Sequence, residues 1–181
     1  MKTSGLHVLL VAAGAASLVA VGGCLSDADL GDGTAACPPA KDFRAVSAVL
    51  ERRCGMLDCH GDVSRPLRLY GQQGLRRPEP PGTKGINFKE YFTGGQQATT
   101  DAEVDDNYTA ACGLEPELMD EAVRQQAKPD DLTLVRKPRL QEKHKGGRIW
   151  AAGSTLGDLC VVSWIQGKVE KEACRLELEK P

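Results

Sequence analysis

The spacing of hydrophobic residues predicts a helix that begins near position 43. Apolar side chains recur at intervals of three, three and one along this stretch, at Phe43, Val46, Val49 and Leu50. That spacing places them on one helical face. Asp42 stands where an N-terminal capping residue belongs, and two arginines near the other end suit the negative end of the helix dipole. We therefore expect a short amphipathic helix that leads directly into Cys54.

Two more helices are predicted nearer the C-terminus. One begins at Glu115-Pro116-Glu117, because proline suits the first helical turn and acidic residues suit its positive end. The other spans 154–168, where Leu159, Val162 and Ile165 fall on one face. The segment 168–181 that follows is highly charged, and we expect it to be a solvated extension of the domain.

The residues between these helices predict loops and short extended segments. Leu67 and Leu69 alternate with polar residues within 65–70, and the sequence INFKEYF at 86–92 has a similar character. Glycine and proline interrupt most of 72–85, which predicts a loop. The predicted fold class is mainly α, a small helical domain over 41–167 with long loops and a few short strands.

Composition agrees with one globular domain and excludes some functions. The chain has 181 residues, of which 41% are hydrophobic and only 4% aromatic. Its core must therefore be aliphatic, or be completed by a bound group. The formal net charge is −2, with no basic stripe, so nothing favours nucleic acid as a partner. An interaction surface of strongly one sign is not expected from these totals.

The N-terminus has the pattern of an export signal. Lys2 is followed by an apolar or small run over 8–21, which is too short for a confident membrane-spanning helix. The run ends in Gly22-Gly23-Cys24, which resembles the lipobox of bacterial lipoproteins. The resemblance implies cleavage of a signal peptide 1–23 and lipidation of Cys24, followed by a flexible tether over 24–40. The protein would then be an exported lipoprotein of the outer membrane, bound to the membrane through its lipid.

The segment from Cys54 to Gly61 carries the strongest chemical pattern. Cys59 is followed immediately by His60, as in the haem-attachment motif C-x-x-C-H, but four residues rather than two separate Cys54 from Cys59. Each thiol could add to a haem vinyl group, and the histidine could bind the iron. Gly55 would help the longer loop to bulge. The alternative is a Cys54–Cys59 disulfide with a surface histidine beside it.

Cysteine usage is consistent with either alternative. Export permits disulfides, and lipidation of Cys24 leaves six of the seven cysteines. If Cys54 and Cys59 hold haem, the four disulfide candidates are Cys37, Cys112, Cys160 and Cys174. These four allow two bridges in three connectivities. Without haem, six cysteines would make three bridges.

A second axial ligand to haem iron could come from either of two residues. His144 precedes Lys145-Gly146-Gly147, and it is the only histidine besides His60 once the signal is removed. The plain alternative is a solvated histidine between two lysines. Met119 is the other candidate, since methionine binds haem iron in many cytochromes. A methionine at helical spacing beside Leu118 is also typical of core packing.

Two stretches together resemble the cytochrome-c-like domains of exported proteins from planctomycetes and myxobacteria. The first contains Val49-Leu50, the segment from Cys54 to Gly61, and Leu67-Arg68-Leu69. The second contains residues 132–138, His144 with its two glycines, and Val162-Ser163-Trp164-Ile165. The resemblance implies one haem c on Cys54 and Cys59, with His60 as its proximal ligand. It implies electron transfer with a redox protein partner, and no catalysis in the strict sense.

Three other functions compete with this one. A haem-free lipoprotein stapled by disulfides could serve as an interaction or structural module of the envelope. A zinc site could form from Cys54, Cys59, His60 and His144, although adjacent Cys59 and His60 side chains point in different directions. A cysteine nucleophile paired with His144 would lack a third group to orient it.

Overall fold

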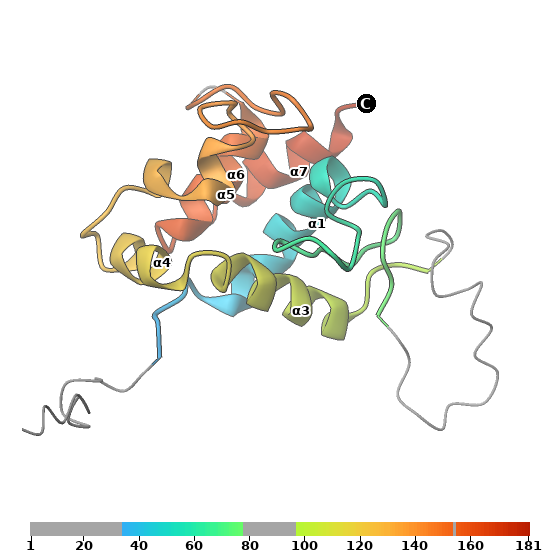
Figure 1. The fold of residues 1–181 in the computed structure, drawn as a ribbon, viewed down its shortest axis with the longest axis horizontal. Coiled ribbons are helices and arrows are strands. Elements are labelled where there is room, and N and C mark those ends of the chain that lie inside the picture. The colour runs from blue at the N-terminus through green and yellow to red at the C-terminus, as the bar shows by residue number, and fades with distance from the viewer. Residues whose placement is uncertain (1–33, 78–96, 154) are drawn as a thin grey trace, which may run out of the picture. The chain divides into compact units, whose positions relative to one another are not determined.

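The computed structural model describes residues 34–77, 97–153 and 155–181, and these residues are mainly helical (Figure 1). The α-helices are α1 (Phe43–Cys54), α3 (Asp101–Cys112), α4 (Pro116–Val123), α5 (Thr133–Arg136), α6 (Leu156–Ile165) and α7 (Lys171–Glu179). Short 3-10 helices span Ala40–Asp42 and Pro129–Asp131. The mainly helical fold class is confirmed. The described residues form only isolated β-bridges, Met56 to Gly74 and Tyr70 to Leu75. Of the two alternatives for 65–70, a short strand or an extended segment, the strand does not form. The segment predicted at 86–92 lies outside the described residues.

The core is built where α1, α6 and α7 pack together (Figure 1). Phe43 at the start of α1 is fully buried, and its ring centre lies 4.7 Å from that of Trp164 on α6. Tyr108 of α3 meets the same Phe43 ring edge-on at 5.4 Å. Aromatic pairs in this geometry add about 0.5–1.5 kcal/mol beyond the area they bury. Three aromatic side chains, one each from α1, α3 and α6, thus pack against one another in the core.

Helix α1 confirms the pattern of apolar residues that predicted it. Phe43, Val46, Val49 and Leu50 are all buried. Asp42 occupies the N-cap position, but its carboxylate makes no capping bond and instead accepts from Lys171, with 2.8 Å between Oδ1 and Nζ. The first turn of α1 is thereby linked to the start of α7.

Helix α3 forms in a stretch for which the hydrophobic pattern predicted no helix. It begins with a capping box, in which the Thr100 hydroxyl accepts from the Glu103 N–H and the Glu103 carboxylate accepts from the Thr100 N–H. Two of its buried positions are polar, Glu103 and Asn107, each at most 1% exposed. The helix therefore has no continuous apolar stripe. Its inner face is held by hydrogen bonds as well as by packing.

Helix α6 is confirmed, and part of its predicted apolar face is buried, since Ile165 is only 1% exposed. Val161 and Trp164 are buried, whereas Leu159 is 46% exposed. Apolar residues surround this ten-residue helix on most sides, so periodicity alone does not select the inner face. Packing of Trp164 against Phe43 selects it instead.

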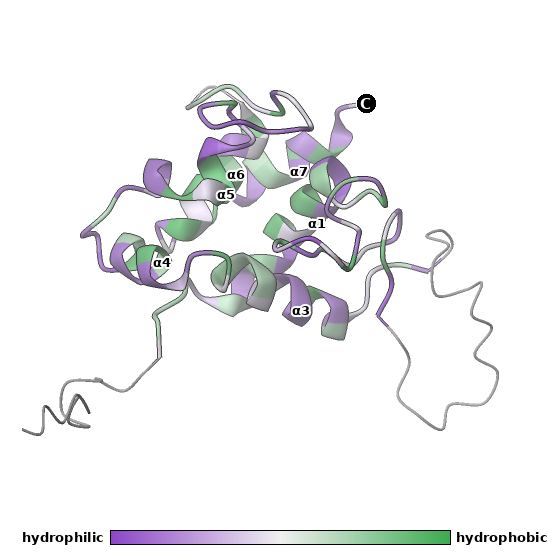
Figure 2. Cartoon of the chain, in the orientation of Figure 1, coloured by the Kyte–Doolittle hydropathy of each residue, from purple (hydrophilic) through white to green (hydrophobic). Residues whose placement is uncertain are grey.

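Residues 168–181 were expected to be a solvated helical extension or tail; the helix forms as α7, but it packs into the core and is not simply solvated. Hydrophilic colours cover much of its surface in Figure 2, yet Ala173, Cys174 and Glu177 are buried. A disulfide joins Cys174 to Cys160 of α6. The charged composition concealed this packing, because the buried carboxylate of Glu177 finds partners inside the protein.

The domain also begins earlier than the predicted boundary at position 41. The compact unit starts at Ala35. Cys37 forms a disulfide with Cys112 at the end of α3, and the carbonyl of Pro38 accepts a hydrogen bond from Tyr108 at 2.8 Å. The end of the predicted tether is therefore fixed to the domain.

Both bridges draw only on the four cysteines proposed as disulfide candidates. The signal segment 1–23 and Cys24 lie outside the described residues. Among the helices described, none has the length and apolarity needed to cross a membrane.

Candidate functional site

The end of α1 and the loop after it bring Cys54, Cys59 and His60 together. The carbonyl of Cys54 accepts a hydrogen bond from the His60 N–H at 2.9 Å. Within the loop, the carbonyl of Met56 accepts from the N–H groups of Cys59 and Gly61, each at 2.9 Å. Residues 56–58 therefore form a tight exposed bulge, and the chain returns to the end of the helix at position 60.

Glycines allow the backbone to pack closely beneath this loop. A Cβ atom on Gly61 would lie 2.2 Å from the carbonyl oxygen of Gly55, and one on Gly74 would lie 1.8 Å from the same oxygen. Gly55 itself has an ordinary φ of −80°. The expectation that Gly55 permits unusual backbone angles is therefore wrong. What these positions require is close approach between backbones.

His60 is held in place from both its ring and its backbone. Its Nδ1 lies 2.8 Å from the Leu67 carbonyl oxygen, and its own carbonyl accepts from the Leu69 N–H at 2.8 Å. If Nδ1 donates to Leu67, the lone pair of Nε2 is left for a metal. Burial lowers the pKa of His60, which favours the neutral form that binds metals.

The segment that supports His60 is itself anchored to α3. The side-chain amide of Asn107 accepts from the Tyr70 N–H at 2.7 Å and donates to the Tyr70 carbonyl at 2.8 Å. One amide thus pairs with both polar groups of one residue, as a neighbouring strand would. Asn107 is fully buried, so these bonds form away from water. Sequence reasoning did not identify this support for the site.

His144 is held by the turn that its two glycines make possible. Its Nδ1 lies 2.8 Å from the Gly147 carbonyl oxygen, which again leaves Nε2 for a metal. Gly147 has a φ of +73°, a conformation that favours glycine. A Cβ on Gly146 would lie only 3.1 Å from Cε1 of the His144 ring. Both glycines therefore help to place this imidazole, one by its backbone conformation and the other by leaving room for the ring.

The fold brings His60 and His144 together from distant parts of the chain. Their ring centres are 6.4 Å apart, and the ring planes differ by 23°. A metal–imidazole bond is about 2 Å long and the ring centre lies about 1.1 Å behind the nitrogen, so two imidazoles on opposite sides of one metal have centres about 6.3 Å apart. At a tetrahedral angle the same bonds would bring the centres to about 5 Å. The observed 6.4 Å is closer to the first of these two values, and the ring planes are stacked.

The two cysteines of the motif are free, whereas the other four described cysteines are paired. Cys54 is 7% exposed, and burial raises the pKa of its thiol to about 12. Burial and the charge of Asp58 raise the pKa of Cys59. Thiols with raised pKa values are poor nucleophiles at neutral pH, so this arrangement gives no support to a cysteine–histidine catalytic pair.

Other candidate ligands are not gathered into a metal cluster. Within the described chain, no three His, Cys, Asp or Glu side chains are placed to hold a metal ion together. The arrangement therefore gives no support to a tetrahedral zinc site made from the motif and His144. Met119 is 1% exposed and belongs to the hydrophobic core, which favours the packing interpretation of this residue.

Two segments carry the histidines: residues 54–65 carry His60 and residues 136–148 carry His144. Their surface is both apolar and cationic. Four of the six large hydrophobic side chains that are exposed in the described chain lie on these segments, namely Met56, Leu57, Val63 and Leu140. Segment 136–148 contains six Lys or Arg residues and one Glu, a net charge of +5 in a chain whose total is −2.

Several cations on or near the two histidine-bearing segments lack a close carboxylate partner. Lys143, Lys145 and Arg148 form no ion pair within the described chain, and the same holds for Arg65, which donates to the Cys59 carbonyl at 3.1 Å. We call these four residues the cationic face. It was not expected from the overall composition, because acidic residues elsewhere offset it.

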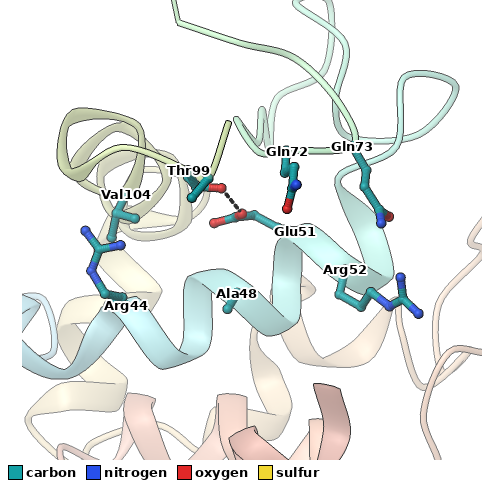
Figure 3. A pocket seen from close by; sticks show the side chains of 9 residues that line it. Arg44, Ala48, Glu51, Arg52, Gln72, Gln73, Thr99 and Val104 are labelled. Atoms are coloured by element: carbon teal, nitrogen blue, oxygen red, sulfur yellow. Dashed lines mark hydrogen bonds between the residues drawn. The ribbon is translucent and has the colours of Figure 1, made fainter. Parts of the chain in front are cut away.

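A cavity of about 290 Å³ lies elsewhere, between α1 and residues 97–104 (Figure 3). The carboxylate of Glu51 accepts a hydrogen bond from Thr99 at its side, and burial raises the pKa of that carboxylate. None of the site residues predicted from the sequence lines this cavity. We therefore place the candidate site at the two histidines and the two free cysteines.

Comparison with family models, with curated proteins and with solved structures finds no match to this chain.

Proposed function

We propose that this chain is a lipid-anchored c-type cytochrome-like protein that binds one haem and transfers electrons in the cell envelope. Cys54 and Cys59 would attach the haem, and His60 and His144 would be its axial ligands. The observation that carries the proposal is the pair of histidines, with ring centres 6.4 Å apart and both Nδ1 atoms within 2.8 Å of backbone carbonyls.

Attachment is chemically simple for these two thiols. Each thiol adds across a vinyl double bond: a sulfur–carbon bond forms, the thiol hydrogen passes to the neighbouring carbon, and no oxidant is consumed. Cys54 is buried at the end of α1 and Cys59 is partly exposed. Attachment at both would direct one edge of the macrocycle toward the core. The exposed apolar side chains of the two segments offer it further surface, which fits a large apolar group.

The ligand set favours electron transfer over catalysis. Bound haem supplies a one-electron iron couple whose potential depends on its axial ligands and their hydrogen bonds. Leu67 and Gly147 would orient the two imidazoles and increase their basicity through Nδ1. With histidine on both sides, no coordination position is left for a substrate. A redox protein is the partner this proposal requires, and lipid on Cys24 would hold the protein at the outer membrane.

The test is to express the full chain in a bacterial host that has haem-maturation machinery. We expect a Soret band, haem that stays bound on a denaturing gel, and an intact mass increased by one haem. Replacing both Cys54 and Cys59 with serine should abolish covalent attachment. Replacing Cys37 and Cys112 with serine is the matched control, because it removes two cysteines but leaves the motif. Wild-type protein without a Soret band and with the mass of the bare chain would overturn the proposal.

The second candidate is a haem-free, disulfide-stapled lipoprotein that acts as an interaction or structural module. The observation in its favour is that two disulfides already link α3 to the N-terminal segment and α6 to α7. It requires a third bridge between Cys54 and Cys59. Intact mass with and without thiol alkylation distinguishes the two candidates, since the haem-free protein would show three bridges, no free thiol and no added haem mass.

A further inference from the structure

We propose that Asp158 of α6 is a positioning residue for His144 and keeps this histidine opposite His60. The inference rests on the proposed function, because it concerns which side chain occupies the second axial position of the haem. Asp158 would not touch the haem itself. It acts through the irregular loop 139–153, to which it is bound at both ends.

Both ends of this loop bind the same carboxylate. Arg139 donates from Nε to Oδ1 of Asp158 at 2.6 Å and from Nη2 to Oδ2 at 3.0 Å. The N–H of Gly153 donates to Oδ2 at 2.7 Å. The side chains of Arg139 and Asp158 are only 4% and 3% exposed. A bidentate pair of this kind fixes orientation as well as distance.

The loop is also closed at its base, so a displacement there would carry His144 with it. The carbonyl of Pro138 accepts from the N–H of Ile149 at 2.8 Å and from that of Trp150 at 3.1 Å. His144 lies within this closed loop and is bonded locally to Gly147. The base is tied to α6 by Asp158, and α6 packs against α1, whose last residue is Cys54. Asp158 therefore links the His144 loop to the helix pair that carries the motif.

A buried charge pair is weak evidence for stability, and in some proteins such pairs fix one specific structure instead. Taking both charges out of water costs several kcal/mol for each ion, and well-packed apolar residues often replace such pairs without loss. Stability alone therefore does not explain a charged pair that is buried to this degree. Placement of the loop explains it, because only an acceptor at position 158 can bind Arg139 and Gly153 at once.

The first arm of the test uses the haem-loaded full chain. Asp158→Asn should release His144 and convert part of the spectrum from low-spin to high-spin. Carbon monoxide binding to the reduced protein should then increase about tenfold or more, which is the usual scale for loss of a supporting hydrogen bond at a metal ligand. Asp130→Asn is the matched control. Asp130 also accepts from Arg139 at 2.6 Å, but its side chain is 58% exposed, and no bond joins it to Gly153 within the described chain.

A second variant separates positioning from folding. The double substitution Arg139→Met and Asp158→Leu removes both charges and fills the space, so it should fold, as judged by circular dichroism and urea unfolding. An apolar side chain cannot accept the Gly153 N–H. We therefore expect this variant also to show the high-spin spectrum and the increased carbon monoxide binding. A purely structural role predicts a wild-type spectrum once folding is restored.

The second arm uses the full chain without haem and measures modification of each histidine by diethyl pyrocarbonate. The rate at His144 relative to that at His60 should rise several-fold in both Asp158 variants and stay unchanged in Asp130→Asn. Lack of haem in the wild type would overturn the proposed function, yet this arm would still decide the role of Asp158. Folded variants with the wild-type ratio and, where haem binds, the wild-type spectrum would overturn the inference.

Discussion

Replacement of Glu177 by glutamine should destabilise the fold more than any comparable change on the surface of α7. The carboxylate is 3% exposed and accepts from four donors on other parts of the chain. Arg53 of α1 donates at 2.9 Å, Gly157 of α6 at 3.1 Å, Trp150 at 3.4 Å and Lys180 at 2.8 Å. One side chain thus joins α7 to α1, to α6 and to the end of the His144 loop.

The magnitude follows from what glutamine cannot do. Its amide keeps one acceptor oxygen, so one buried donor among Gly157 and Trp150 loses its partner, at a cost of about 1–3 kcal/mol. The charge-assisted bond from Arg53, whose side chain is 20% exposed, is worth about 1.5–3 kcal/mol. Lys180 is 44% exposed and can be hydrated, so we count nothing for it. The free energy of unfolding should fall by about 3 kcal/mol, out of the 5–15 kcal/mol typical of a domain.

Urea unfolding at neutral pH measures this change as a midpoint lowered by about 1.5 M. Glu172→Gln is the matched control on the same helix, because within the described residues its exposed carboxylate pairs only with Arg175 of α7. That variant should show no measurable shift. Equal midpoints for the two variants would refute the reasoning.

The same variant has a pH signature. Burial acts to raise the pKa of Glu177, but Lys180 and Arg53 outweigh it and hold the pKa below its ordinary value of 4.5. A lowered pKa in the folded state stabilises the protein above about pH 4.5, and this contribution is lost as the pH falls through the folded-state pKa. The difference between wild type and Glu177→Gln should therefore shrink as the pH falls below about 4.5. A difference that does not vary with pH would show that the charge of Glu177 contributes nothing.

Three further predictions follow from other contacts. Gly74→Ala should lower the free energy of unfolding, measured in urea, by about 1–3 kcal/mol, because the added Cβ would meet the Gly55 carbonyl oxygen. Gly113→Ala should cost less, because a Cβ there would lie 3.1 Å from its nearest atom. Replacing Cys37 and Cys112 by serine opens a loop of 75 residues and should cost about 4.5 kcal/mol in urea, against about 3 kcal/mol for the 14-residue separation of the other bridge. In stopped-flow measurements, ferricyanide should oxidise the reduced haem protein more slowly as salt is added. The cationic face attracts this anion at low salt, whereas the net charge of −2 alone would repel it.

Sequence patterns predicted those parts of the fold in which apolar packing determines structure. Helix α1 follows from its regular apolar spacing, and α4 from its proline and acidic first turn. Helix α3 was missed because Glu103 and Asn107 stand at two of its buried positions. Burial of α7 was missed because a charged residue, Glu177, also stands at one of its buried positions. From the sequence alone, a glutamate is expected on the surface. Long-range hydrogen bonds determine these elements, and no local pattern encodes them.

In the candidate site too, local patterns predicted the chemical groups but not the contacts that support them. Residue type and local spacing were enough to select the two histidines, and the paired glycines beside His144 have a local structural reason. The supports that hold each histidine were not predictable. Asn107 reaches His60 only through Tyr70 and its neighbours, and Asp158 reaches His144 only through the loop ends. The Asn107 support joins residues 37 apart in sequence, and the Arg139–Asp158 pair joins residues 19 apart, so neither follows from a local pattern.

The four-residue gap between the cysteines was the main objection to haem attachment, and the loop geometry weakens it. What limits attachment is the separation of the two thiols in space, not the number of residues between them. The turn centred on the Met56 carbonyl places the additional residues in the exposed bulge, and the bond from the His60 N–H to the Cys54 carbonyl returns the histidine to the end of α1. Close packing of Gly55 against Gly61 and Gly74 holds this closed form. A loop that is two residues longer can thus present its cysteines and histidine from one compact turn, as the proposed attachment requires.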